Sequence, residues 1–331
     1  MKTETHLIPQ EQKLPTEKGR ERRRMIFIAG PTGCGKTALS LLLAEELGGE
    51  IISADSMQIY RGMNIGTAKA RPEQLAKIPH HMVDIRDLDE PFSVVDYYYE
   101  AEQAITRIEG RGKVPIVVGG AGFYLHALLY GPPSGPPSVP ALRQQFEAEI
   151  DIRGADEMYN RLVQIDPDYA ETITPTDRQK IVRALEIISL TGGPVSQFSW
   201  RGRAPLVQGD FRCWFLCRQR DLLYQRVEER CEEMVQAGLL EEVERLLSKG
   251  LRENRSASQS IGYRQAIEYL DSRRTPADYE RFMQSFKTAS RRYVKRQFTW
   301  FRKEPLFKWL DADAYDIEVL VDMMVQDWRM S

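Results

Sequence analysis

Short apolar segments alternate with longer helix-forming segments over the first 120 residues. Residues 24–29, 50–54 and 113–118 are apolar runs of the length of buried strands. Residues 38–47 and 93–109, which lie between these runs, have the composition and spacing of helices. Strands that alternate with helices in this way form a parallel sheet covered by helices, so this part of the chain predicts an α/β core.

The pattern changes after residue 130. Residues 131–140 contain five prolines and two glycines, which indicates a semi-rigid linker. Apolar residues then recur at helical spacing over 141–191, and an apolar run at 211–217 predicts one more strand. From residue 222 to about 303 the chain is mostly helical in pattern. We therefore expect a helical module inserted between two parts of one α/β domain.

Composition narrows the class of protein. Of the 331 residues, 42% are hydrophobic and 28% are charged, and 46 Lys and Arg nearly balance 48 Asp and Glu. These values exclude a disordered chain, a collagen, a coiled coil and a uniformly basic nucleic-acid coat protein, but they allow a local basic face. At about 150 residues per domain, the length suggests two domains.

Cysteine usage and the lack of long apolar runs point to the cytoplasm. The four cysteines form no Cys-x-x-Cys pair and are too few for a disulfide framework, and the histidines lack metal-ligand spacing. No apolar run approaches the roughly 18 residues that span a bilayer. The first 24 residues have no apolar centre of the kind found in secretion signals. We therefore expect a cytoplasmic protein without membrane partners.

The strongest motif is Gly-Pro-Thr-Gly-Cys-Gly-Lys-Thr at residues 30–37, which matches the P-loop pattern GxxxxGK[ST]. It lies between a predicted strand and a predicted helix, where backbone amides and the helix N-terminus can bind phosphate. In such a loop Lys36 reaches the phosphates and the Thr37 hydroxyl binds Mg²⁺. A chance glycine-rich turn is the alternative. We predict a phosphate site in a P-loop NTPase-like core.

Two features follow other predicted strands at the same edge of the sheet. Asp55 stands at the carboxyl end of the second strand, where a carboxylate can act as a base or support a metal. An ordinary turn or helix-capping role is the alternative. Gly119 and Gly120 end the third strand and give the backbone close access to the site, although a simple turn explains them equally well.

Basic residues gather in two places in the second half of the chain. Arg226 and Arg230 lie four residues apart, on one face of a predicted helix, where they could clamp a diphosphate or pair with Glu228 and Glu229. Residues 281–303 contain eight Lys or Arg, six aromatic residues and no acid. Such a segment suits phosphate binding, whereas core packing is the favoured role of its aromatic side chains.

The predicted organisation has four parts. We expect a disordered polar tail, a P-loop α/β core with a helical C-terminal part, an inserted helical module, and a C-terminal helix. Their ranges are, in that order, 1–24, then 25–132 with 205–310, then 133–204, and finally 311–331.

In these motifs the sequence resembles the tRNA dimethylallyltransferase family, also called tRNA isopentenyltransferases, in its bacterial form. The matching segments occur in family order over about residues 25–310, and the segment 55–69 is far more specific than the P-loop. They are residues 30–37, 55–69 (Asp-Ser-Met-Gln-Ile-Tyr-Arg-Gly-Met-Asn-Ile-Gly-Thr-Ala-Lys), 81–85, 118–120, 183–186, 262–265 and 295–300.

The resemblance implies transfer of a dimethylallyl group from its diphosphate to N6 of the adenosine 3′ of the tRNA anticodon. It makes Asp55 the general base, with Lys36 and Thr37 also catalytic, and Thr37 the Mg²⁺ ligand. The donor diphosphate would bind Gly30, Pro31, Thr32, Gly33, Cys34, Gly35, Lys36, Thr37 and Arg230. The anticodon stem-loop would contact Asp55, Ser56, Met57, Gln58, Ala121, Gln179, Lys180, Ile181, Val182 and Arg183.

The sequence departs from the family pattern at two positions. Cys34 replaces a usual Ser, at a position where the loop contributes its backbone. Ala121 replaces a Thr that commonly contacts tRNA. No set of Cys and His matches the C-terminal zinc finger of some eukaryotic relatives, and we expect a monomer.

Three other functions are alternatives to this transfer. A small-molecule or nucleotide kinase would place ATP on the P-loop and use Asp55 to deprotonate an acceptor hydroxyl. A prenyltransferase could act on free AMP, although a mononucleotide needs no inserted helical module. A non-enzymatic tRNA-binding protein would have no use for Lys36, Thr37 and Asp55.

Overall fold

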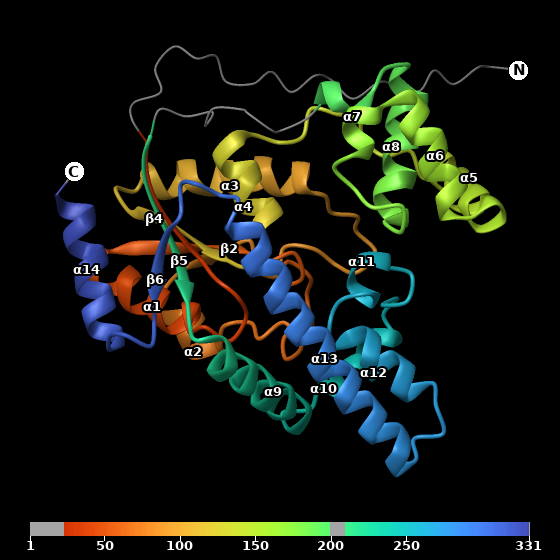
Figure 1. The fold of residues 1–331 in the computed structure, drawn as a ribbon. Coiled ribbons are helices and arrows are strands. Elements are labelled where there is room, and N and C mark those ends of the chain that lie inside the picture. The colour runs from red at the N-terminus through yellow and green to blue at the C-terminus, as the bar shows by residue number, and fades with distance from the viewer. Residues whose placement is uncertain (1–22, 199–208, 331) are drawn as a thin grey trace, which may run out of the picture.

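The computed structural model describes residues 23–198 and 209–330, and a six-stranded sheet forms its centre (Figure 1). Every neighbouring pair of strands is parallel, and the order is β3-β2-β4-β1-β5-β6. The strands are β1 (Arg24–Ala29), β2 (Gly49–Ala54), β3 (His80–His81), β4 (Val114–Gly119), β5 (Asp210–Cys217) and β6 (Lys308–Asp311). The predicted parallel α/β sheet is therefore confirmed.

Helices cover both faces of the sheet. Along β1, Met25, Phe27 and Ala29 belong to one buried cluster, and Ile26 and Ile28 belong to another. The first cluster includes residues of α3 (Val94–Glu109) and α4 (Gly122–Tyr130), and the second includes residues of α1 (Lys36–Leu47) and α14 (Ile317–Arg329). A strand buried on both faces has no polar side to show, which explains its continuous apolar run.

The carboxyl ends of three strands are aligned. Ala29 of β1 and Ala54 of β2 both stand opposite Gly119 of β4. A Cβ atom at Gly119 would lie 2.1 Å from the Ala54 carbonyl oxygen, so only glycine fits there. The segments that begin at Gly30, Asp55 and Gly120 consequently leave the sheet at one edge.

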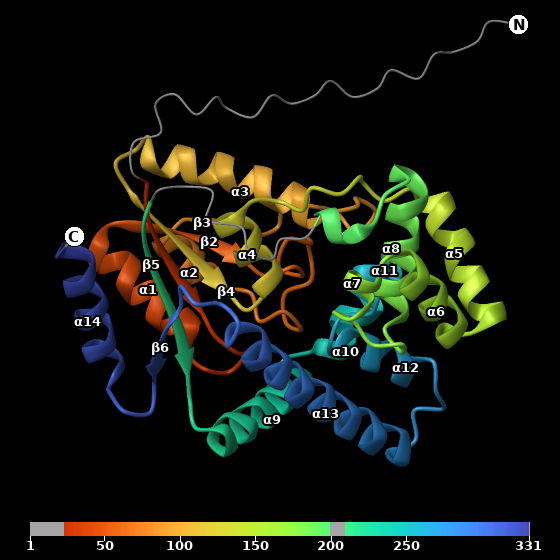
Figure 2. The same ribbon diagram turned by 45° about the horizontal axis from the view of Figure 1, so that its top comes forward.

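A second group of helices extends from this edge and has its own buried cluster (Figures 1 and 2). The long helix α13 (Pro276–Phe301) runs beside α9 (Arg220–Gln236) and α12 (Tyr263–Leu270), and α10 (Leu239–Leu247) also packs on α12. The cluster includes residues of the loop after β2, so it joins this group to the sheet. The short helix α11 (Arg255–Ser258) contributes Ala257 to the same cluster. Helix α2 (Pro72–Lys77) contributes no residue to it and instead pairs through Lys77 with Glu45 of α1 at 2.8 Å.

The inserted module is a separate helical unit beside the α/β core (Figure 2). Buried Glu186 accepts hydrogen bonds from Ser138 Oγ (2.8 Å) and Val139 N (2.6 Å), which fastens the proline-rich linker to the module. An ion pair between Arg255 and Glu147 connects the module to α11. Its elements are α5 (Pro140–Arg153), α6 (Ala155–Ile165), α7 (Pro167–Ala170), α8 (Arg178–Thr191) and the 3₁₀ helix η1 (Val195–Phe198).

The structure differs from the predicted organisation at the C-terminus. Residues 308–311 form a sixth strand, and α14 packs on α1, so this segment completes the sheet and its covering layer. The predicted tail lies outside the described residues up to position 22, whereas Arg24 begins β1. Residues 199–208, between the module and β5, also lie outside the described residues. Within the described residues, no helix is long and apolar enough to cross a membrane.

Candidate active site

The P-loop is held in shape by hydrogen bonds to its own carbonyl groups. Lys36 Nζ donates to Gly30 O and to Pro31 O, each at 2.8 Å, and has a longer contact of 3.9 Å with Cys34 Sγ. Gly35 has a φ of 105°, a left-handed conformation in which glycine avoids strain. Sulfur is a weak acceptor, so a phosphate oxygen can replace Cys34 as the third partner of the Lys36 ammonium.

Three charged side chains from separate elements interact electrostatically beside this loop. Burial lowers the pKa of Lys36, nearby Arg230 lowers it further, and Cys34 and Asp55 oppose the shift. Burial also lowers the pKa of Arg230, against the opposing effect of Asp55. The structure thus brings together the predicted catalytic lysine, the carboxylate and the diphosphate-binding arginine.

Asp55 has one carboxylate oxygen engaged in a turn. Its Oδ1 accepts hydrogen bonds from Met57 N (2.8 Å) and Gln58 N (3.4 Å). Within the described part of the chain Oδ2 accepts none, so it is available to a substrate donor. Asp55 can therefore hold the predicted turn with Oδ1 and act on a substrate with Oδ2.

The charge of Asp55 acts on four tyrosines. Its negative charge adds to burial in raising the pKa of four tyrosines. Two of them, Tyr97 and Tyr124, stack with their ring centroids 3.9 Å apart. The four are Tyr97, Tyr124, Tyr263 and Tyr293. Asp55 therefore lies close enough to these tyrosines for its charge to act on their hydroxyl groups.

Gln297 of α13 connects two of the segments that leave the sheet edge. Its Oε1 accepts a hydrogen bond from Thr32 N in the P-loop, and its Nε2 donates to Gly120 O, each at 3.1 Å. A Cβ atom at Gly120 would lie 2.1 Å from Gln297 Nε2, so this glycine makes room for the amide. The sequence placed Gln297 in the matching segment 295–300 but indicated no role for it, because its partners lie 265 and 177 positions away.

The loop after Asp55 is fixed by a buried carboxylate that the sequence also did not reveal. Glu242 of α10 accepts hydrogen bonds from Asn64 N (3.0 Å), Ile65 N (2.8 Å), Gly66 N (3.2 Å) and the Tyr263 hydroxyl (2.6 Å). Glu242 is only 1% exposed, so these four donors replace water as the partners of its carboxylate.

Lys69 fixes the end of the same loop. Its amine donates to Tyr60 O (3.0 Å), Asn64 Oδ1 (3.0 Å) and Asp84 Oδ1 (2.6 Å). Burial lowers the pKa of Lys69, and Asp84 opposes that shift. The segment 55–69, which carries most of the family resemblance, is thus shaped by buried charges.

The residues predicted to contact tRNA lie in different surroundings. Ser56, Met57 and Gln58 lie next to Asp55 and are partly exposed. Ala121 is the N-cap residue of α4, and its amide donates to Ala54 O at 3.2 Å. On α8, Gln179 and Lys180 are exposed.

The other three predicted residues of α8 are turned inward or engaged. The side chains of Ile181 and Val182 are buried in the module core. Arg183 pairs with Glu186 at 2.7 Å and donates to Pro136 O in the linker. Apolar spacing marks Ile181 and Val182 as core positions, so the structure does not present their side chains to tRNA.

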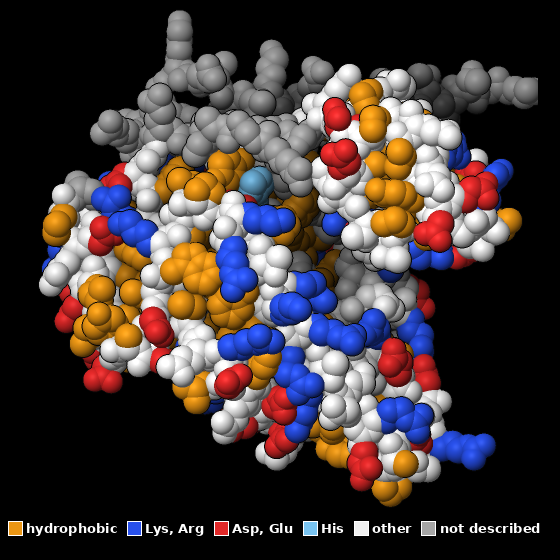
Figure 3. Space-filling view, viewed as in Figure 1, with side chains coloured by type: hydrophobic (Ala, Val, Ile, Leu, Met, Phe, Trp, Pro, Cys, Tyr) orange, Lys and Arg blue, Asp and Glu red, His pale blue; other side chains and the backbone are white. Residues whose placement is uncertain are grey.

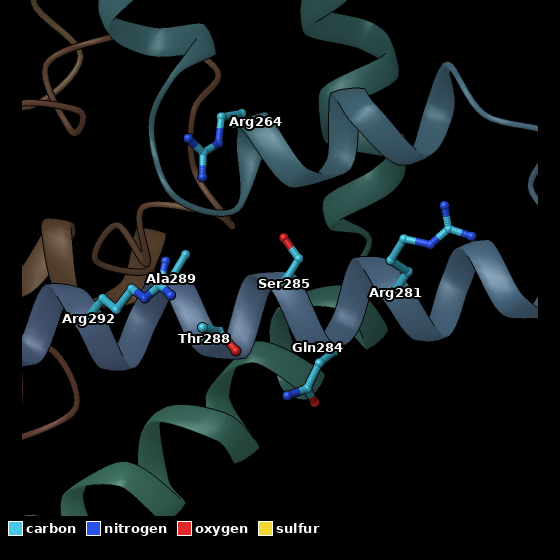
Figure 4. Close-up of a pocket in the computed structure, with 7 residues that line it drawn as sticks. All are labelled: Arg264, Arg281, Gln284, Ser285, Thr288, Ala289 and Arg292. Carbon is cyan, nitrogen blue, oxygen red and sulfur yellow. The ribbon is translucent and has the colours of Figure 1, made fainter. Parts of the chain in front are cut away.

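A basic surface follows α13 between the core and the module (Figure 3). Part of it is a cleft of about 330 Å³ between α12 and α13 that contains Arg264, Arg281 and Arg292 (Figure 4). The segment 281–303 contains no acid, but α9 neutralises two of its charges in the folded chain. Lys287 pairs with Glu232, and Arg291 pairs with Glu228. The predicted core packing of the aromatic residues holds for Phe282, Phe286 and Phe301, which are buried.

The residues present fit a magnesium ion that is held mainly by substrate. Thr37 lies exposed in the first turn of α1, and no described cluster of three His, Cys, Asp or Glu could bind a metal alone. Mg²⁺ commonly keeps its waters and binds through phosphate oxygens with one or two protein ligands. The Thr37 hydroxyl, beside the P-loop, fits the role of that protein ligand.

Comparison with known proteins gives one consistent result. The sequence profile described as "IPP transferase" matches residues 58–304. The chain is 57% identical to the tRNA dimethylallyltransferase of Protochlamydia amoebophila (strain UWE25), over 97% of this chain and 93% of that protein.

Solved structures agree with the sequence comparison. The chain resembles the full-length tRNA isopentenylpyrophosphate transferase of Bacillus halodurans, with a TM-score of 0.66 and 36% identity over 94% of this chain and 98% of that one. It also resembles a eukaryotic dimethylallyltransferase acting on tRNA, with a TM-score of 0.72 and 29% identity over 89% and 75% of the two chains.

Proposed function

The chain belongs to the IPP transferase family, and from this premise we propose that it moves a dimethylallyl group from dimethylallyl diphosphate to N6 of the adenosine 3′ of a tRNA anticodon. It is a tRNA dimethylallyltransferase in fold and class. The observation that carries the detailed proposal is the meeting of Lys36, Asp55 and Arg230 beside the P-loop.

The donor diphosphate binds in the P-loop. Backbone amides, the N-terminus of α1 and the cations Lys36 and Arg230 stabilise the negative charge that grows on the leaving diphosphate. Mg²⁺, bound by the Thr37 hydroxyl and the diphosphate oxygens, would supply further charge neutralisation. These groups favour cleavage of the allylic C–O bond.

Asp55 acts on the acceptor. An adenine N6 amine is a weak nucleophile, and a carboxylate that accepts its hydrogen bond assists the attack. The N6–C bond forms as the C–O bond breaks, diphosphate departs, and the N6 proton passes to Asp55 Oδ2. Because Oδ1 is occupied by the Met57 and Gln58 amides, the carboxylate keeps its orientation during the transfer.

The surface supports a large polyanionic acceptor over a small one. The basic face along α13 and the inserted module extend beyond anything that a mononucleotide or a small kinase substrate would need. The adenine leaves its stack to reach Asp55, at a cost of a few kcal/mol that is smallest in a flexible loop. These features favour the anticodon stem-loop over free AMP.

Labelled dimethylallyl diphosphate offered with unmodified tRNA, with AMP, or with ATP and small acceptors tests the proposal. We expect transfer to tRNA alone. Asp55→Asn should lower kcat by about 10²- to 10⁴-fold with tRNA affinity retained, because asparagine keeps an oxygen for the turn but cannot take a proton. Asp89→Asn, a change at an exposed carboxylate, is the matched control. Near-normal turnover of Asp55→Asn would contradict the assignment.

We also propose that the enzyme acts in the cytoplasm as a monomer. All four cysteines are free thiols, which suits a reducing compartment. Light scattering at several protein concentrations tests the oligomeric state.

A further inference from the structure

Two arginines donate hydrogen bonds to backbone carbonyl groups of the P-loop. Arg226 Nε donates to Gly33 O at 3.2 Å, and Arg218 Nε donates to Cys34 O at 3.1 Å. In a trans peptide the C=O and N–H groups point in opposite directions. A fixed Cys34 carbonyl therefore orients the amide of Gly35 away from Arg218.

The orientation of the peptide between Cys34 and Gly35 depends on a restraint of this kind. Gly35 has no Cβ and a φ of 105°, so its own side chain restricts the peptide very little. The Lys36 amine reaches the carbonyls of Gly30 and Pro31, at the other end of the loop. Arg218 is thus the side chain that restrains the peptide leading into α1.

Arg218 is itself held from the C-terminal part of the chain. Its guanidinium pairs with Asp313, in the loop between β6 and α14, and both side chains are largely buried, with 22% and 15% exposed. Asp313 Oδ2 also accepts the Gln219 amide at 2.7 Å, while the Asp313 amide donates to Asp311 Oδ1 at 2.9 Å. Arg218 and Asp313 are therefore each restrained by further hydrogen bonds, which fixes the geometry of this charge-assisted pair.

These groups border a cleft of about 660 Å³ on the outer side of the P-loop, with Gly35, Arg218 and Asp313 in its lining. Water in such a cleft competes for the Cys34 carbonyl, and an unpaired arginine would be free to turn into the cleft. The ion pair with Asp313 keeps the guanidinium on the loop.

We propose that Arg218, held by Asp313, is a positioning residue for the donor: it fixes the Cys34–Gly35 peptide with its amide directed to the diphosphate. This inference rests on the proposed function of the P-loop. It makes the segment from β6 to α14 part of the donor site, although that segment lies beyond the residues 58–304 that the family profile matches.

The expected signature is a separation of KM from kcat. Without the Arg218–Asp313 pair, binding must orient the loop, so donor affinity falls; once the donor is bound, the diphosphate itself orders the amide and turnover is retained. Asp313→Asn should therefore raise the Kd of inorganic pyrophosphate and the KM of dimethylallyl diphosphate about tenfold. The kcat and the Kd of tRNA should stay near the wild-type values.

Matched variants define the comparison. Asp316→Asn removes a carboxylate that lines the same cleft without pairing to Arg218, and should leave the KM of the donor unchanged. Asp313→Glu keeps the charge and should restore part of the donor affinity. Arg218→Lys should behave like Asp313→Asn, because lysine cannot donate to a carbonyl and a carboxylate as a planar fork. It also provides a second test if Asp313→Asn melts at a markedly lower temperature.

The outcomes are distinguishable. Wild-type donor affinity in folded Asp313→Asn and Arg218→Lys overturns the inference while leaving the proposed function in place. An equal loss of donor affinity, kcat and tRNA affinity also overturns it, since that pattern marks a general structural role. If the wild-type protein binds neither pyrophosphate nor dimethylallyl diphosphate, the proposed function itself fails.

Discussion

At the scale of single residues, Lys36 combines two demands that conflict. It must be charged to neutralise a diphosphate, yet its partly buried position and the neighbouring Arg230 lower its pKa. A bound diphosphate reverses this effect, because an opposite charge favours the charged amine. Donor binding is therefore linked to protonation of Lys36.

This linkage predicts the pH dependence of donor affinity. Below the pKa of Lys36 the amine is charged with and without donor, so affinity is flat. Above it, binding must take up a proton, and the logarithm of the Kd should rise by about one per pH unit. Because the pKa is lowered from 10.5, the rise should begin at a lower pH than for an ordinary lysine.

Pyrophosphate binding measured across the alkaline range tests this prediction. Lys36→Arg is the control, because arginine stays charged throughout and the ligand's own titration then affects both proteins equally. A constant ratio of the two affinities over the whole range would show that Lys36 does not carry the linkage.

Residues of the site were predictable from sequence where their signal is local. Lys36 belongs to an eight-residue motif, and Asp55 directly follows a strand. Glu242 and Gln297 fix loops of the site, but each acts through backbone groups more than 170 positions away. Gln297 lies in a segment that resembles the family, yet nothing in the sequence of either helix indicates these partners, so only the fold reveals them.

At the scale of elements, the loop after β2 depends on α10 for its shape. The amides of residues 64–66 converge on the buried Glu242 carboxylate, which the Tyr263 hydroxyl also contacts. Burial, reinforced by Glu242, raises the pKa of that tyrosine. The loop is thus held by one charge on a neighbouring helix.

Glu242→Gln should loosen this loop. A neutral amide makes weaker hydrogen bonds and leaves a buried donor without a partner, so the free energy of unfolding should fall by about 2 kcal/mol. Hydrogen exchange of the amides of residues 64–66 should accelerate. Denaturant unfolding and exchange measured by mass spectrometry give both quantities.

Glu241→Gln is the matched control, since Glu241 is exposed on the same helix. We expect its stability and exchange rates to stay at the wild-type values. Equal behaviour of the two variants would remove Glu242 from its role in the loop.

A helix or strand was predictable from sequence when its own residues carry a clear apolar pattern. The strands at 24–29, 50–54 and 113–118 are continuous apolar runs, and the structure has strands at these places. Strand β6 is only Lys-Trp-Leu-Asp and is mostly exposed, so its sequence has no apolar run. It becomes a strand because β5 offers an edge with which to pair.

At the scale of the whole molecule, α13 links the parts of the site. Its basic face lines the cleft with Arg264, its Gln297 holds the P-loop, and its buried aromatic residues pack into the core. The sequence predicted a basic segment, but only the fold shows which of its charges α9 neutralises.

Salt dependence of tRNA binding should separate the two kinds of charge. Arg292 and Lys295 are exposed and form no ion pair among the described residues. Replacing both by glutamine should weaken tRNA binding and reduce the slope of log Kd against log salt by about two, one for each phosphate that the variant leaves unneutralised. Titrations followed by fluorescence anisotropy at several salt concentrations give the slope.

Lys287 and Arg291 provide the comparison, because Glu232 and Glu228 already balance their charges. Replacing this second pair by glutamine should change the slope less. Equal slopes for the wild type and the Arg292/Lys295 double variant would place the tRNA phosphates elsewhere.

The position of β1 in the sheet also determines when the core can be completed during synthesis. One neighbour, β4, is available once residue 119 has emerged from the ribosome, but β5 begins only at residue 210. At 5 to 20 residues per second, this interval lasts roughly 5 to 20 s. The module, whose core comes from residues close in sequence, can fold within it. One side of β1 therefore remains unpaired in the nascent sheet until β5 has been synthesised.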